Sequence, residues 1–150
     1  MIETALGTSI AFTAPHRLAT KAGFDILEGG GTAVEAMVAA AAQIAVVYPH
    51  MNSIGGDGFW LIKKRGQSPV AISACGSAAQ QATPEWYDKK GYKSSLPTRG
   101  PLAALTVPGT IAGWKLALEL DNPKRAIPLN ELLSAAVERA KNGVAVTKNQ

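Results

Sequence analysis

Apolar residues recur along the first third of this chain at the spacing of helices that pack against other layers. Residues 18–27 place apolar side chains on one face and charged ones elsewhere, and the glycines at 29–31 end the pattern. Thr32 is suited to cap a second helix over residues 33–47, and Glu35 completes the capping-box pattern. Because this second segment is nearly all small and apolar, we expect other elements to cover most of its sides.

Shorter apolar runs elsewhere predict β-strands. Residues 59–63 and 69–74 are β-like and are joined by residues 64–68, a loop of hairpin length that favours an antiparallel pair. Residues 9–13 also read as a strand, which Ala14-Pro15-His16 ends. The sequence therefore predicts one early strand and one hairpin.

The rest of the chain is a series of helical segments separated by polar loops. A short helix is predicted over residues 84–89, and Pro108-Gly109-Thr110 opens another that runs to residue 120. Pro128 opens the last helix, with its apolar residues on one face, and Gly143 ends it. We find no repeat, low-complexity tract or linker. We therefore expect no domain boundary within residues 1–150, and we expect the rest of the domain to lie beyond residue 150.

A glycine-rich turn links the second helix to the hairpin. Pro49 stops the helical pattern, a polar turn follows, and Gly55, Gly56 and Gly58 precede the first hairpin strand. Glycines at these positions allow positive φ or a close approach of another backbone. Helix, turn and strand within so few residues predict a layered packing site around this segment.

Composition excludes several classes of protein. With 47% hydrophobic and 17% charged residues, the 150-residue chain is neither disordered nor fibrous and is long enough for one ordinary domain. The net charge is +4, but the basic residues are scattered without interleaved aromatic side chains, so we expect no nucleic-acid partner. The longest apolar segment, residues 33–48, contains Glu35 and Gln43 and is too short for a confident membrane span, so we expect no membrane partner.

The single cysteine bears on the cellular compartment. Cys75 cannot form an internal disulfide, and the N-terminus lacks the basic start and apolar core of a secretory signal. Both observations favour a cytoplasmic location. Small neighbours on either side of Cys75 favour a buried structural thiol over a nucleophile.

No motif for a metal, a phosphate or a nucleotide is present, and we expect no cofactor. The segment Gly55-Gly56-Asp57-Gly58 lacks both the lysine of a phosphate loop and the spacing of a dinucleotide fingerprint. Neither His16 nor His50 has a second ligand at helical or strand spacing, so a structural role is favoured for each. The residues alone therefore contain no complete catalytic set.

Two residues are candidates for substrate binding. Arg99 lies in a turn between a polar loop and an apolar segment, from which its guanidinium could bind a carboxylate; a surface or carbonyl-capping role is the alternative. Asp57 lies between glycines at the start of a strand. It could orient a substrate amine or a nucleophile, or it could instead bond the amides of its own turn.

The order of several motifs resembles the γ-glutamyltranspeptidase family. The resemblance begins with residues 14–23 (APHRLATKAG) and 26–36 (ILEGGGTAVEA), and continues through residues 46–59, which contain YPH and IGGDGF. Residues 107–114 (VPGTIAGW) and the helix over residues 128–143 follow in the same order. The similarity covers nearly the whole chain, and several of its motifs are long and specific.

This resemblance implies an α+β fold, part of the αββα sandwich of an N-terminal-nucleophile hydrolase, made as a precursor that cleaves itself into two subunits. In that family a threonine at the new N-terminus of the second subunit attacks an amide carbonyl, with its own α-amine as base. Neither that threonine nor the family's glycine-built oxyanion hole is expected within residues 1–150, which resemble the N-terminal portion of the large subunit. The expected partners are a small amide substrate and the nucleophile-bearing subunit, and this piece alone is predicted to be inactive.

One departure from the family pattern bears on the substrate. Members that recognise a γ-glutamyl group carry an arginine for its α-carboxylate, and Pro84 stands at that position here. Because proline offers no cation, glutathione is not the expected substrate. The Asp57 turn and the Thr98-Arg99-Gly100-Pro101 turn are more similar to the amidohydrolase-type branch, which includes oxamate amidohydrolases. Arg99 is our candidate to replace the missing arginine for a small carboxylate-bearing amide.

Other interpretations remain open at this stage. The full-length protein could be an authentic γ-glutamyltransferase or glutathione hydrolase, or an enzyme of the cephalosporin-acylase branch. It could also be a non-catalytic module that keeps the fold without the nucleophile. A small, complete ligand-binding domain is a further alternative. We disfavour it because the apolar second helix needs more sheet than two or three strands can supply.

Overall fold

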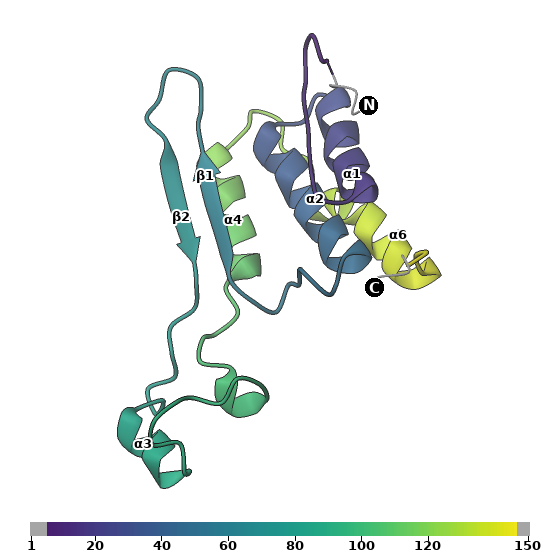
Figure 1. The fold of residues 1–150 in the computed structure, drawn as a ribbon. Helices are drawn as coiled ribbons and strands as arrows, with labels where there is room; N and C mark the ends of the chain where they lie inside the picture. The colour runs from purple at the N-terminus through teal and green to yellow at the C-terminus, as the bar shows by residue number, and fades with distance from the viewer. Residues whose placement is uncertain (1–5, 147–150) are drawn as a thin grey trace. The chain divides into compact units, whose positions relative to one another are not determined.

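The computed structural model describes residues 6–146, which divide into two compact units. The first, called here the helical unit, contains the described residues up to Ile54 and from Trp114 onward. The second, called the hairpin unit, is Gly55–Gly113. Figure 1 labels most of their helices and both strands.

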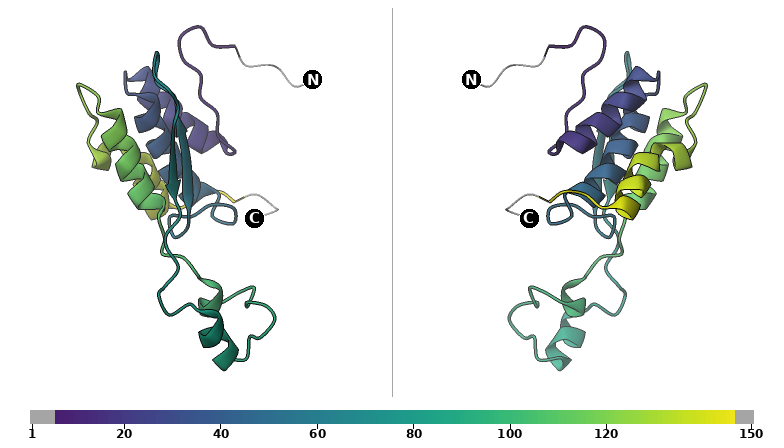
Figure 2. Two further views of the ribbon diagram at one scale, coloured as in Figure 1. Left: turned by 90° about the vertical axis from the view of Figure 1, so that its left-hand side faces the viewer. Right: turned by 90° about the vertical axis from the view of Figure 1, so that its right-hand side faces the viewer.

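The helical unit is built around α2 (Ala33–Val47). Helix α1 (Arg17–Glu28) packs along it, and α5 (Leu129–Leu132) and α6 (Ser134–Asn142) also contact it. Helices α1 and α2 lie side by side in both views of Figure 2. The unit also contains the last part of α4 (Thr110–Asp121), whose first residues belong to the hairpin unit.

Local sequence signals set the ends of α1 and α2. His16 caps α1, since its Nδ1 accepts a hydrogen bond from the backbone N–H of Leu18 at 3.2 Å. Thr32 and Glu35 form the predicted capping box: the Thr32 hydroxyl accepts from Glu35 N at 3.1 Å, and Glu35 Oε2 accepts from Thr32 N at 2.8 Å. The boundaries of α2 are those predicted from the sequence.

Helix α2 is covered on most of its sides, as its composition predicts. Its buried residues are Val34, Glu35, Ala36, Val38, Ala39, Ala40, Ala42, Gln43, Ile44 and Val47. Glu35 is only 1% exposed, and its Oε1 accepts a hydrogen bond from Ile127 N at 2.7 Å. This buried carboxylate therefore joins the start of α2 to the chain segment that leads into α5.

The hairpin unit contains the predicted antiparallel pair, β1 (Gly58–Ile62) and β2 (Val70–Ala74). Trp60 lies opposite Ile72 on one face, and Leu61 lies opposite Ala71 on the other. Ile72 is 7% exposed, whereas Leu61 is 78% exposed. The hairpin therefore has a packed inner face and an apolar outer face that is open to solvent. The unit also holds α3 (Pro84–Lys89), as predicted, and the 3₁₀ helix η1 (Pro101–Ala103).

Two predictions about secondary structure are wrong. No strand forms over residues 9–13, because no other strand pairs with this segment in the part of the chain that the structure describes. The ring of Phe12 instead occupies the space beside Gly23 of α1. The single helix predicted from Pro128 is two helices, α5 and α6, which meet at Leu133. Gly143 ends α6 as predicted, with a φ of 79°.

Within residues 6–146, none of the helices combines enough residues with enough apolar character to cross a membrane.

Candidate functional site

The glycine-rich turn before β1 is attached to the start of α4. The backbone N–H groups of Gly109 and Thr110 both donate to the carbonyl oxygen of Gly56, each at 3.0 Å. The Thr110 hydroxyl lies 2.7 Å from the same oxygen and 3.1 Å from the carbonyl oxygen of Asp57. The first N–H groups of a helix have no partner within the helix, so the turn satisfies donors that α4 would otherwise leave open.

Close packing fixes the same segment against the end of β2. A Cβ atom at Gly109 would overlap the carbonyl of Ala74, and one at Gly76 would overlap the backbone of Val107. Val107 N also donates to the carbonyl of Ser77 at 3.1 Å. Glycine is therefore required at both positions for the two backbones to come this close.

Asp57 lies at the centre of this arrangement, directly before β1. Its side chain is exposed, and its Oδ1 accepts a hydrogen bond from the Thr106 hydroxyl at 3.4 Å. The backbone of Asp57 is held by Thr110 and its carboxylate is contacted by Thr106, both from the segment that starts α4. The structure thus presents a carboxylate to solvent from a tightly anchored turn.

Arg99 lies elsewhere in the same unit, in the bend before η1. Gly100, which follows it, has a φ of 87°, a conformation that favours glycine. The Arg99 side chain is exposed, and among residues 6–146 it forms no hydrogen bond or ion pair. The two predicted site residues are therefore in one unit but are not in contact with each other within the described chain.

A cavity of about 400 Å³ lies beside α3 in the hairpin unit. Pro84, Tyr87 and Lys93 are among the residues that line it, and Arg99 is not. The Tyr87 hydroxyl donates to the carbonyl of Leu102 at 2.9 Å, which ties α3 to η1. The pKa of Glu85 is lowered because its carboxylate accepts a hydrogen bond from its own backbone N–H and a second from Thr83.

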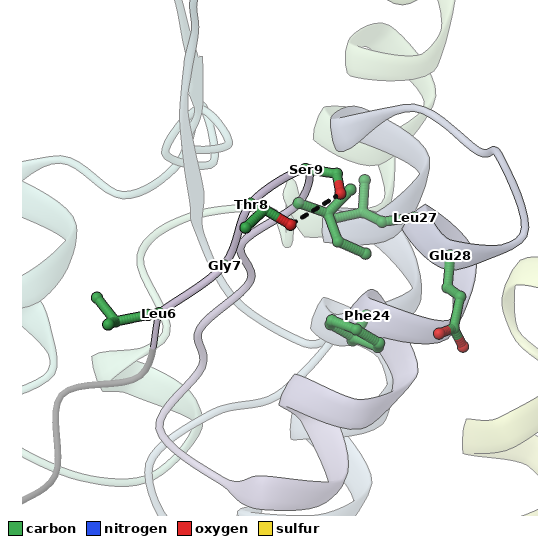
Figure 3. Close-up of a pocket in the computed structure, with 8 residues that line it drawn as sticks. Leu6, Gly7, Thr8, Ser9, Phe24, Leu27 and Glu28 are labelled. Atoms are coloured by element: carbon green, nitrogen blue, oxygen red, sulfur yellow. Dashed lines mark hydrogen bonds between the residues drawn. The ribbon is translucent and has the colours of Figure 1, made fainter.

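A second cavity, of about 500 Å³, lies in the helical unit between the N-terminal segment and α1 (Figure 3). Phe24, Leu27 and Glu28 contribute to it from α1, and Leu6 to Ile10 complete the lining. Among the described residues that line it, Glu28 supplies the one carboxylate, without a second titratable group. The described lining therefore offers no pair of groups for acid–base or nucleophilic chemistry.

The two histidines and the cysteine were the remaining candidates from the sequence. His16 caps α1, and the His50 ring packs edge-on against Tyr48 with the ring centres 4.2 Å apart. Cys75 was predicted to be buried, and this is wrong: the thiol is exposed, because the inward positions of β2 are Ile72 and Ala74. Within the described residues, no group of three His, Cys, Asp or Glu side chains is placed to bind a metal ion.

Sequence reasoning missed Thr106 and Thr110 as parts of this site. A threonine after Pro-Gly at the start of a helix predicts a cap for that helix. It does not predict hydrogen bonds to carbonyls 53 and 54 residues earlier in the chain.

A model of the gamma-glutamyltranspeptidase family matches residues 19–150 of this sequence. The chain belongs to the γ-glutamyltranspeptidase family. The oxamate amidohydrolase proenzyme of Klebsiella pneumoniae is 52% identical to it over 139 residues, which are 91% of this chain and 26% of that protein. The glutathione hydrolase proenzyme of Escherichia coli is 36% identical over 129 residues, which are 85% of this chain and 22% of that protein.

A solved structure from the γ-glutamyltranspeptidase family supports the same assignment. The crystal structure of Helicobacter pylori γ-glutamyltranspeptidase matches with a TM-score of 0.80 and 34% identity, covering 100% of this chain and 42% of that one. The chain therefore has the predicted α+β fold and forms part of the αββα N-terminal-nucleophile hydrolase sandwich. It spans about a quarter of the length of the curated γ-glutamyltranspeptidase relatives.

Proposed function

We propose that this chain is the N-terminal part of the large subunit of a self-cleaving amide-bond hydrolase or acyl transferase. The observation that carries the proposal is the 52% identity to an oxamate amidohydrolase proenzyme over 91% of this chain. In this proposal the full-length protein acts in the cytoplasm, and a second subunit from the same precursor supplies the nucleophile. Residues 1–150 alone would then be inactive.

The proposed reaction passes through an acyl-enzyme. The hydroxyl oxygen of the N-terminal threonine attacks the amide carbonyl, and its proton moves to the threonine's own α-amine. The carbon–nitrogen bond then breaks, and the leaving ammonia or amine takes up that proton. Water, or a second amine in the transferase case, attacks the resulting ester and releases the acyl group.

The proposed substrate is a small amide that carries a carboxylate, such as oxamate, rather than glutathione. Pro84 opens α3 and provides no cation. In this proposal it stands in place of the arginine that γ-glutamyl-specific members of the family carry. Arg99 is exposed and, within residues 6–146, has no competing anionic partner. A guanidinium binds a carboxylate through two parallel hydrogen bonds, so Arg99 is proposed to hold the substrate carboxylate.

Asp57 is proposed to orient a nitrogen group that takes part in the reaction, either the substrate amide or the α-amine of the nucleophile. Its exposed carboxylate accepts hydrogen bonds and can therefore bind the N–H groups of a substrate amide or the α-amine of the nucleophile. Its anchored turn supports this role, because a group that orients a reactant must itself be held in place.

The decisive experiment measures hydrolysis by the full-length protein. Oxamate, a γ-glutamyl anilide and a glutaryl amide are offered separately, and the released ammonia or amine is measured with mass identification of the acyl product. We expect two bands on denaturing electrophoresis and preferential hydrolysis of oxamate. Preference for the γ-glutamyl compound would favour a glutathione hydrolase, and preference for the glutaryl amide a cephalosporin-acylase-like enzyme. A folded, uncleaved and inactive protein would favour a non-catalytic module.

The role of Arg99 has its own test in the same enzyme. Arg99→Ala is expected to raise KM for the carboxylate-bearing amide by about tenfold or more, since a charge-assisted bidentate contact is lost. Arg99→Lys keeps the positive charge but lacks the planar guanidinium, so its KM should lie between those of the parent enzyme and Arg99→Ala. Arg65→Ala, which removes an exposed arginine of the hairpin loop, is the matched control. Unchanged KM in Arg99→Ala would exclude Arg99 from substrate binding.

A further inference from the structure

Thr110 has an unusual position for a residue that starts a helix. It is 8% exposed, and its hydroxyl lies within hydrogen-bond distance of two successive carbonyl oxygens, those of Gly56 and Asp57. A threonine that caps its own helix accepts a hydrogen bond from an N–H in the first turn. The Thr110 hydroxyl instead donates, and it donates to the turn that carries a candidate site residue.

The two carbonyls differ in how much they depend on this hydroxyl. The Gly56 carbonyl also receives the backbone N–H groups of Gly109 and Thr110. The carbonyl of Asp57 receives the Thr110 hydroxyl at 3.1 Å. The two carbonyls share the one hydroxyl hydrogen of Thr110, with Gly56 the nearer acceptor at 2.7 Å. Removing the hydroxyl therefore leaves the turn attached to α4 through the two N–H groups on Gly56, while the backbone of Asp57 loses its contact with Thr110.

The same segment also reaches the Asp57 side chain. Thr106 donates to Asp57 Oδ1 at 3.4 Å, a longer and weaker bond than that between Thr110 and Gly56. Gly109, between the two threonines, is pressed against the carbonyl of Ala74, which prevents the segment from shifting toward β2. The backbone and the side chain of Asp57 are thus both contacted from one closely packed segment.

We propose that Thr110 is a positioning residue for Asp57, with Thr106 as a weaker second contact to its carboxylate. Thr110 does not touch the substrate. It sets the place from which the Asp57 carboxylate meets the nitrogen of the substrate or the nucleophile. This inference rests on the proposed function, and it goes further by naming the residues that make Asp57 effective.

A double-mutant cycle in the processed, full-length enzyme tests this inference, with steady-state hydrolysis of oxamate as the assay. The variants are Asp57→Asn, Thr110→Val and their combination, and Thr110→Ser is the matched control that keeps the hydroxyl. We expect Thr110→Val to lower kcat/KM by about five- to tenfold, the effect of losing one hydrogen bond, whereas Thr110→Ser stays within about twofold of the parent enzyme.

The combination separates positioning from a merely structural role. If Thr110 acts through Asp57, adding Thr110→Val to Asp57→Asn has little further effect on kcat/KM, because the group being positioned is already disabled. Effects that multiply independently would overturn the inference while leaving the proposed function intact. Equal losses in Thr110→Ser and Thr110→Val would overturn it as well, since the hydroxyl would then not be responsible.

Two further controls keep the test decisive. If Thr110→Val does not yield folded enzyme by thermal melting, the pair Thr106→Val and Thr106→Ser replaces it, with the same expected non-additivity toward Asp57→Asn and a smaller effect. If Asp57→Asn leaves the activity unchanged, the inference is wrong, because Asp57 is the residue that Thr110 is proposed to position. A processed enzyme that hydrolyses none of the three amides would overturn the proposed function, and the inference with it.

Discussion

Helix α2 and the β1–β2 hairpin are both built mainly from apolar residues, yet their exposure is opposite. Ten of the fifteen residues of α2 are buried, including its one carboxylate. On the hairpin, the outer-face residues Phe59 and Leu61 are 73% and 78% exposed. Helices α1, α5 and α6 thus cover the apolar residues of α2, whereas no described residue within 6–146 covers Phe59 and Leu61 on the outer hairpin face. An apolar pattern therefore predicts that a face will be covered, but not which segment covers it.

The largest expected effect concerns the outer hairpin face. In the full-length protein we expect the second sheet of the αββα sandwich to cover Leu61, so that Leu61→Ala lowers the free energy of unfolding by about 3 kcal/mol, as for other buried leucines. Leu61→Met, which conserves volume, should cost less than about 1.5 kcal/mol. Chemical denaturation of the full-length variants measures both. If Leu61→Ala lowers the free energy of unfolding by less than about 0.5 kcal/mol, the outer hairpin face stays exposed in the full-length protein. The hairpin would then differ from α2 in the full-length protein as well.

An intermediate effect is expected at the buried carboxylate of α2. Glu35→Ala leaves the N–H groups of Thr32 and Ile127 without their acceptor, which should lower the free energy of unfolding by about 2 kcal/mol. Glu35→Gln keeps one acceptor oxygen and should lose less. The same denaturation measurement applies, and a Glu35→Ala variant as stable as the parent protein would show that these hydrogen bonds do not stabilise the helical unit.

The smallest effect is expected at the helix cap itself. Thr32→Ala removes the acceptor for Glu35 N and should cost about 1 kcal/mol, while Thr32→Ser keeps it and should cost little. The melting temperatures of the two variants provide the comparison. If they are indistinguishable, packing of α2 rather than its cap determines where the helix begins.

The features that sequence could predict are those set by near neighbours in the chain. The bounds of α2 follow from Thr32 and Glu35, three residues apart, and the hairpin follows from two short runs joined by a short loop. The strand predicted over residues 9–13 failed for the opposite reason. A strand needs a second strand to pair with, and the residues of the segment itself do not indicate whether such a strand is present.

The candidate site shows the same division. The sequence identified Asp57 and Arg99 as candidates and, through resemblance, the family, and the family assignment is confirmed. Whether Asp57 and Arg99 bind substrate stays a prediction. The anchoring of Asp57 by Thr110 could not be predicted, because it depends on a contact between residues 53 positions apart. Likewise, no local signal indicated that Gly76 and Gly109 lie where two backbones meet.

The shared carbonyl of Gly56 also bears on how fast the start of α4 exchanges its protons with water. Amides in the first turn of a helix usually exchange quickly, since they have no acceptor within the helix. Here the amides of Gly109 and Thr110 are occupied by Gly56, so their exchange requires the turn and the helix to separate. These two amide protons therefore report directly on how often the Asp57 turn opens.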